Sequence, residues 1–79
     1  MKKVYVCLNS IDKVKHFVNN ITKFETSSDL ISGRYVIDAK SVMGILSLNL
    51  SKPIELKIHE EDAAVCDKII SSVKEYIVA

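Results

Sequence analysis

Apolar residues recur every three or four positions between residues 11 and 24, which is the spacing of one face of an α-helix. This stripe consists of Ile11, Val14, Phe17, Val18, Ile21 and Phe24. The opposite side of the predicted helix carries the polar residues Asp12, His16, Asn19 and Lys23. Asn9 and Ser10 precede the stripe, and both have side chains that cap helix N-termini. A helix with one apolar face requires a second layer that covers this face.

Short segments of alternating apolar and polar residues supply the second layer. Residues 4–8 and 54–58 each place every second side chain on one apolar face. Residues 29–32 and 35–37 are predicted to pair as a hairpin, because the glycine at the junction 32–34 suits a tight turn. The apolar faces consist of Val4, Val6 and Leu8 in the first strand and, after Pro53, of Ile54, Leu56 and Ile58 in the last.

Two further helices are predicted. Residues 41–48 have the composition of a short helix, and Asn49 is suited to end it in a left-handed conformation. Residues 60–77 return to helical periodicity, with a stripe made of Cys66, Ile69, Ile70, Val73, Tyr76 and Ile77. The acidic residues Glu60, Glu61 and Asp62 suit the positive end of this helix dipole.

The predicted element order is strand, helix, strand, strand, helix, strand, helix. Strands with one apolar face, interleaved with helices of one apolar face, predict an α+β open-faced sandwich: a four-stranded sheet with three helices on one face. The 79 residues suffice for one small core, so we expect a single domain over residues 1–79.

Charge and composition exclude several function classes. Eleven Lys and Arg balance ten Asp and Glu, which gives a net charge of +1 and no electrostatic basis for binding DNA, RNA or an anionic membrane. No apolar run approaches the roughly 20 residues that a membrane span needs. We therefore expect a cytoplasmic protein without nucleic-acid partners or membrane insertion.

Cysteine and histidine placement favours structural roles. Cys7 and Cys66 lie in apolar segments and form no CxxC spacing, so buried free thiols are favoured over a disulfide or a redox pair. His16 and His59 are far apart and have no partner in a recognised ligand spacing. We expect no metal site and no cofactor.

The segment from Lys40 to Leu48 reads KSVMGILSL and resembles the KSIMGxMSL motif of HPr proteins, the histidine-containing phosphocarriers of the sugar phosphotransferase system. The resemblance extends over nearly the whole chain, with Lys23-Phe24 closing the first helix and an acidic start to the last. It implies the HPr-like open-faced β-sandwich, in the element order predicted above.

The phosphate-carrying stretch of the family departs from its pattern here. Phosphocarriers have Gly-x-His-x-Arg-Pro after the first strand, whereas this chain has the residues LNSIDK at positions 8–13. The gap-free alignment places Ser10 at the histidine, Asp12 at the arginine and Lys13 at the proline. A serine hydroxyl forms a stable phosphate ester instead of a readily transferred phosphoryl bond, and Asp12 repels a phosphate. The resemblance therefore implies a degenerate member without phosphoryl transfer, and we expect no enzymatic activity.

The resemblance assigns two roles to the second predicted helix, residues 41–48. Ser41 corresponds to the serine that an ATP-dependent kinase phosphorylates in HPr proteins of many Gram-positive bacteria. Val42, Met43 and Leu46 correspond to the apolar patch through which HPr proteins dock onto other proteins. Simpler interpretations stand beside both: Ser41 as a helix N-cap, and a short helix that buries its apolar residues.

Three hypotheses for function follow. The first is a regulatory or protein-binding domain related to the phosphotransferase system, controlled by phosphorylation at Ser41, with phosphotransferase components or an HPr-type kinase as partners. The alternative is a working phosphocarrier with His16 as the acceptor, although His16 lies nearly two turns inside the predicted helix, beside Asp12, like an ordinary surface histidine. The third is a structural domain that associates with its own copy.

Overall fold

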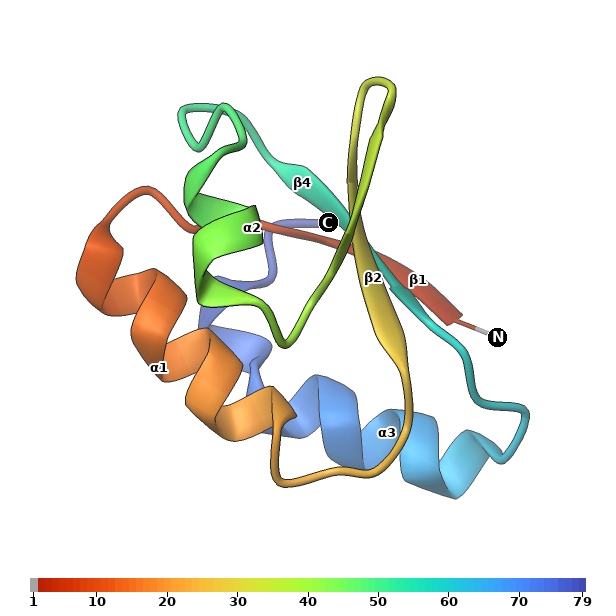
Figure 1. Ribbon diagram of the computed structural model, residues 1–79. Helices are drawn as coiled ribbons and strands as arrows, with labels where there is room; N and C mark the ends of the chain where they lie inside the picture. Colours follow the sequence, from red (N-terminus) through yellow and green to blue (C-terminus); the bar gives the residue numbers. More distant parts are fainter. Residues whose placement is uncertain (1) are drawn as a thin grey trace.

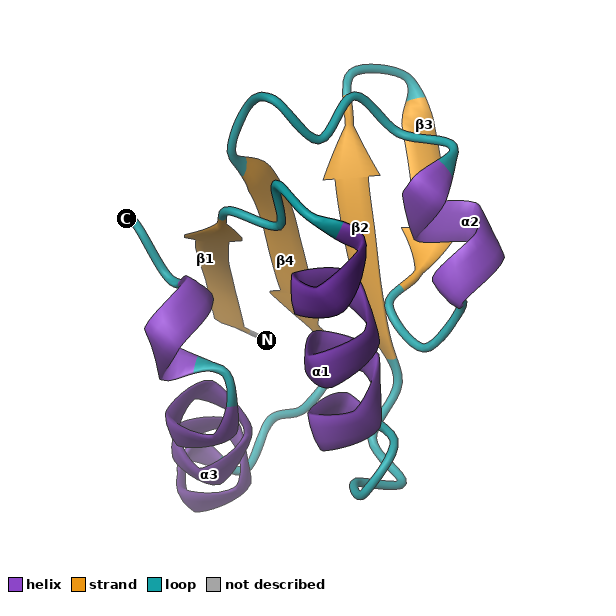
Figure 2. Ribbon diagram, turned by 90° about the vertical axis from the view of Figure 1, so that its left-hand side faces the viewer, coloured by secondary structure: helices purple, strands orange, loops and turns teal. Residues whose placement is uncertain are grey.

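The computed structural model describes residues 2–79 as one antiparallel sheet with helices on one of its faces (Figures 1 and 2). The elements follow the predicted order and end with an added 3₁₀ turn. They are β1 (Lys2–Val6), α1 (Ile11–Ile21), β2 (Ser28–Ser32), β3 (Tyr35–Asp38), α2 (Val42–Leu46), β4 (Ile54–Ile58), α3 (Ala63–Ser72) and η1 (Lys74–Tyr76). The predicted fold class is therefore confirmed.

The strand that comes last in the sequence, β4, lies between β1 and β2, and the sheet order is β1-β4-β2-β3. Every neighbouring pair is antiparallel. Register places Leu56 opposite both Val4 and Leu30, and Leu30 opposite Ile37. These side chains form one row across the four strands on the helix side, so the apolar faces of all four strands lie on the same side of the sheet.

The core lies between this face of the sheet and the apolar stripes of α1 and α3. Phe17 of α1 and Tyr76 of η1 meet edge to face, with ring centroids 6.1 Å apart and an interplanar angle of 75°. Burial of the Tyr76 phenol, followed by the hydrogen bond and charge of Glu75, raises its pKa above the ordinary value. The largest fully buried side chains are Phe17, Leu8, Ile21, Leu30, Ile45, Ile54, Leu56, Ile58, Ile69, Val6, Val14 and Val73.

The first strand begins and ends two residues earlier than the predicted range 4–8. Its pairing with β4 stops at Val6 opposite Ile54, and the next position of β4 is Pro53, which has no N–H to donate. Leu8 is nevertheless fully buried, just beyond the strand. The alternation in the sequence identified the buried side chains, whereas the proline ended the ladder.

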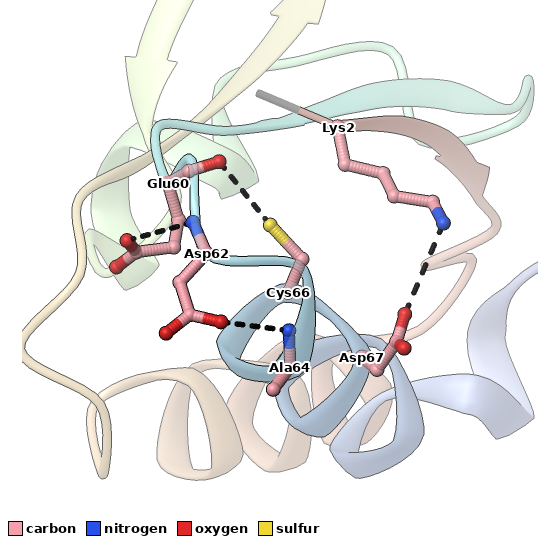
Figure 3. A network of polar contacts seen from close by, with 6 residues as sticks. All are labelled: Lys2, Glu60, Asp62, Ala64, Cys66 and Asp67. Atoms are coloured by element: carbon pink, nitrogen blue, oxygen red, sulfur yellow. Dashed lines mark hydrogen bonds and ion pairs between the residues drawn. The ribbon is translucent and has the colours of Figure 1, made fainter.

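The last helix is shorter than the predicted range 60–77. It begins after Asp62, whose carboxylate accepts a hydrogen bond from the N–H of Ala64 at 2.9 Å, while Glu60 accepts one from the N–H of Asp62 (Figure 3). It ends at Ser72, because the chain then turns so that residues 76–79 can hydrogen-bond to the outer edge of β1. Tyr76 is still buried as predicted, but from a 3₁₀ turn.

Three smaller predictions were wrong. Ile11 is 58% exposed because it is the first residue of α1, and Phe24 lies beyond the end of that helix, where it is half-buried. Asn49 does not adopt a left-handed conformation, since Gly33 is the single residue with positive φ in the described chain. Instead, the Asn49 side chain accepts hydrogen bonds from the N–H and hydroxyl of Ser51.

Two glycines are required for different reasons. Gly33 has φ +60° in the two-residue turn between β2 and β3, a conformation that other residues adopt at a cost. Gly44 lets α2 approach β3, because an ideal Cβ atom there would lie 2.5 Å from Cγ2 of Ile37. The close contact between α2 and β3 therefore depends on the missing side chain of Gly44.

We expect Gly44→Ala to lower the free energy of unfolding by about 1–3 kcal/mol, because the added methyl group meets Ile37. Urea denaturation measures this change. In an Ile37→Ala background the cost of Gly44→Ala should shrink, whereas the cost of Gly33→Ala, which has no neighbour within 4 Å, should be unchanged. An equal cost of Gly44→Ala in both backgrounds would contradict this account of α2 packing.

Candidate functional site

Ser41 stands at the start of α2 and acts as its N-cap. Its backbone is extended, with φ −101° and ψ 104°, and its hydroxyl accepts a hydrogen bond from the N–H of Gly44 at 3.1 Å. The Ser41 N–H donates to the Asp38 carbonyl at 3.0 Å. The side chain is half-buried, so its oxygen is fixed in position without being enclosed. The capping role predicted for Ser41 is thereby observed.

Lys40, next to Ser41, has its ammonium group engaged elsewhere. Its Nζ donates to the Phe24 carbonyl at 2.7 Å, and its backbone N–H donates to Oδ1 of Asp38 at 2.9 Å. Both bonds fix the loop that leads from β3 into α2. The sequence did not predict them, because they join residues that only the tertiary fold brings together.

The apolar residues of α2 divide between the core and the surface. Ile45 is fully buried, and Met43 on the other side is 79% exposed. Val42 and Leu46 are half-buried and pack against the core at its margin. We call Val42, Met43 and Leu46 the α2 surface. A methionine this exposed beside half-buried aliphatic side chains is suited to contact with another protein.

Ser10 occupies the corresponding place at the start of α1. Its hydroxyl accepts the N–H of Lys13 at 3.2 Å, and Nζ of Lys13 donates to Oδ1 of Asn9 at 2.9 Å. Asp12 lies exposed in the first turn of the same helix. The end of α1 is thus capped by the serine, and its first turn already carries a negative charge.

The two histidines lie in different surroundings. His16 is exposed in the second turn of α1, where the backbone N–H groups serve the helix itself. His59 follows β4, and its Nε2 lies 2.6 Å from Oδ2 of Asp29 on β2. The sequence did not indicate Asp29 as a neighbour of His59, because that contact depends on the register between β2 and β4.

Within residues 2–79, no group of three or more His, Cys, Asp or Glu residues is placed to hold a metal ion, and no pocket is present. Cys7 and Cys66 are free thiols, and Cys66 is buried with its Sγ 3.3 Å from the Glu60 carbonyl (Figure 3). None of the helices described is long and apolar enough to span a bilayer.

We expect Ser41→Ala to lower the free energy of unfolding by about 1 kcal/mol, because the N–H of Gly44 loses its partner. Ser41→Asp should retain most of the stability, since a carboxylate also caps a helix N-terminus. Ser71→Ala, at an exposed position inside α3, is the matched control and should change stability by less than about 0.5 kcal/mol. Urea denaturation of the four proteins checks this, and equal stability of wild type and Ser41→Ala would contradict the cap.

Comparison with known proteins supports the architecture. No protein-family model matches the sequence, and no curated protein sequence matches it either. A solved structure does match: HPr-C-His from Thermoanaerobacter tengcongensis, with a TM-score of 0.73, 20% sequence identity, and coverage of 95% of this chain and 93% of that chain. At this identity the likeness concerns the fold, and the chain has the HPr-like open-faced sandwich fold.

Proposed function

We propose that this chain is a regulatory, protein-binding relative of HPr that lacks phosphoryl transfer and binds its partner through the α2 surface. The exposed Met43, flanked by Val42 and Leu46, is the observation that carries the proposal. Surfaces that bind other proteins combine an apolar centre with a polar rim. Here Ser41 and Ser47 provide polar groups at the two ends of the helix.

Loss of phosphoryl transfer is supported by the chemistry at the start of α1. Ser10 stands where the aligned phosphocarriers have histidine, and its hydroxyl is occupied as a cap. A phosphoserine ester does not transfer its phosphate readily, so Ser10 does not replace an imidazole. His16 has the right chemistry, but it lies inside the helix, where the backbone offers no free N–H groups to hold a phosphate.

Ser41 is the residue that we assign to regulation. Phosphorylation there places about two negative charges at the N-terminus of α2, beside the α2 surface. The partly exposed hydroxyl is within reach of a kinase that first docks on Met43. Asp38 precedes Ser41 by three residues, and its carboxylate accepts a hydrogen bond from the Lys40 N–H. A phosphate on Ser41 therefore adds negative charge close to a carboxylate, and the changed charge beside the α2 surface alters which partner binds.

Incubation with phosphoenolpyruvate and the general phosphotransferase enzyme tests the loss of transfer. We expect the intact mass to show no acid-labile phosphate, while an authentic HPr in the same reaction is modified. The physical reason is that Ser10 replaces the nucleophile. An acid-labile adduct that disappears in His16→Ala would instead establish the alternative, a phosphocarrier that uses His16.

Incubation with ATP and an HPr-type kinase tests the α2 surface and Ser41 together. We expect one acid-stable phosphate, absent in Ser41→Ala. Met43→Asp should slow the modification about tenfold or more, because a carboxylate replaces the apolar anchor. Val78→Asp is the matched control, since Val78 is 56% exposed but lies at the far edge of the sheet, and it should react at the wild-type rate. Equal rates for Met43→Asp and wild type would remove the α2 surface from the proposal.

A further inference from the structure

The two edges of the sheet differ in whether other backbone segments hydrogen-bond to them. The outer edge of β1 is covered by the C-terminal residues: the Tyr5 N–H donates to the Ala79 carbonyl and the Val78 N–H to the Tyr5 carbonyl, both at 2.9 Å. The outer edge of β3 has no such cover, because no other described residue forms a backbone hydrogen bond with Val36 on its outer side. Figure 2 shows β3 as the outermost strand on that side of the sheet.

The β3 edge carries none of the lysines, prolines or bulges that commonly keep sheet edges apart, and its one charged residue, Asp38, lies at its end. The strand reads YVID, with Tyr35 68% exposed and Val36 61% exposed. An uncovered strand with exposed apolar side chains is suited to pair with another strand.

The hairpin geometry fixes which backbone groups of β3 point outward. Ser32 and Tyr35 flank the two-residue turn, so they form a hydrogen-bonded pair, and so do Leu30 and Ile37. The N–H and carbonyl of Val36, which lies between them, therefore point away from β2. The N–H of Asp38 points the same way, whereas its carbonyl already accepts the Ser41 N–H.

The sequence of this edge is complementary to itself. When a second copy pairs antiparallel with Val36 opposite its own equivalent, the outward N–H and carbonyl groups of the two valines meet. Tyr35 then lies opposite Ile37 of the second copy, so apolar side chains share the helix side of the sheet. Arg34 lies opposite Asp38 of the second copy, which pairs opposite charges at both ends of the contact.

We propose that two copies of this chain associate through their β3 edges, in this register, to form one continuous antiparallel sheet around a two-fold axis. The contact is isologous, so each attractive pair occurs twice. A single pair of four-residue strands is a small interface, and the dimer is therefore weak and concentration-dependent. This contact is separate from the α2 surface and does not depend on the proposed function.

Cysteine cross-linking tests the register. In Val36→Cys, the two Cα atoms would lie about 5.5 Å apart across the two-fold axis, which suits a disulfide. The control is Val78→Cys, with similar exposure at the opposite edge and the same two native cysteines. At equal concentration under a mild oxidant, the Val36→Cys dimer should form at least about tenfold faster, because association raises the local thiol concentration. Equal rates for the two variants would overturn the register.

Sedimentation equilibrium tests the association without a cross-link. Between about 10 μM and about 1 mM, the wild type should shift from monomer toward dimer. Val36→Lys should stay monomeric with an unchanged circular dichroism melt, since two ammonium groups would face each other at an exposed position, and Val78→Lys should behave as wild type. A wild type that stays monomeric at the highest concentration, or a Val36→Lys variant that dimerises equally, would refute the proposal.

Discussion

The burial of one face of β4 is the constraint on which the rest of this fold depends. Ile54, Leu56 and Ile58 are each no more than 1% exposed, and their strand pairs with β1 on one side and β2 on the other. A one-residue slip of β4 would bring Glu55 and Lys57 into the core and turn all three apolar side chains to solvent. The position of β4 thus fixes the registers of both neighbouring strands and the surface on which α1 and α3 pack.

The helices α1 and α2 both begin with a serine N-cap. Ser10 and Ser41 each accept a backbone N–H three residues later in the chain. In α1 the cap stands where the sequence resemblance places the histidine of phosphocarriers, so Ser10 has a structural role of its own there. In α2 the cap holds a partly exposed hydroxyl beside Met43, so the oxygen that stabilises the helix is also accessible at the α2 surface.

The exposed apolar residues gather where the sheet and helices leave their contacts incomplete. Met43 projects from α2 because Gly44 and Ile45 occupy the side that meets β3 and the core. Tyr35 and Val36 lie on the edge strand that the C-terminus does not cover. These two regions are on different elements, so the partner binding proposed for α2 and the self-association proposed for β3 can be tested by separate substitutions.

The sequence by itself determined the element order, the turn at Gly33, both serine caps and most of the buried side chains. Each of these follows from local periodicity or from the chemistry of a few neighbouring residues. The tertiary structure alone decided where the first strand ends, that residues 73–77 leave the last helix, and that His59 meets Asp29. Each of these features depends on a neighbour that is distant in the sequence. Pro53 lies opposite the end of β1, the C-terminal residues pair with the outer edge of β1, and the β2–β4 register brings His59 to Asp29. Such neighbours cannot be predicted from the local sequence, because the packing of the whole sheet determines them.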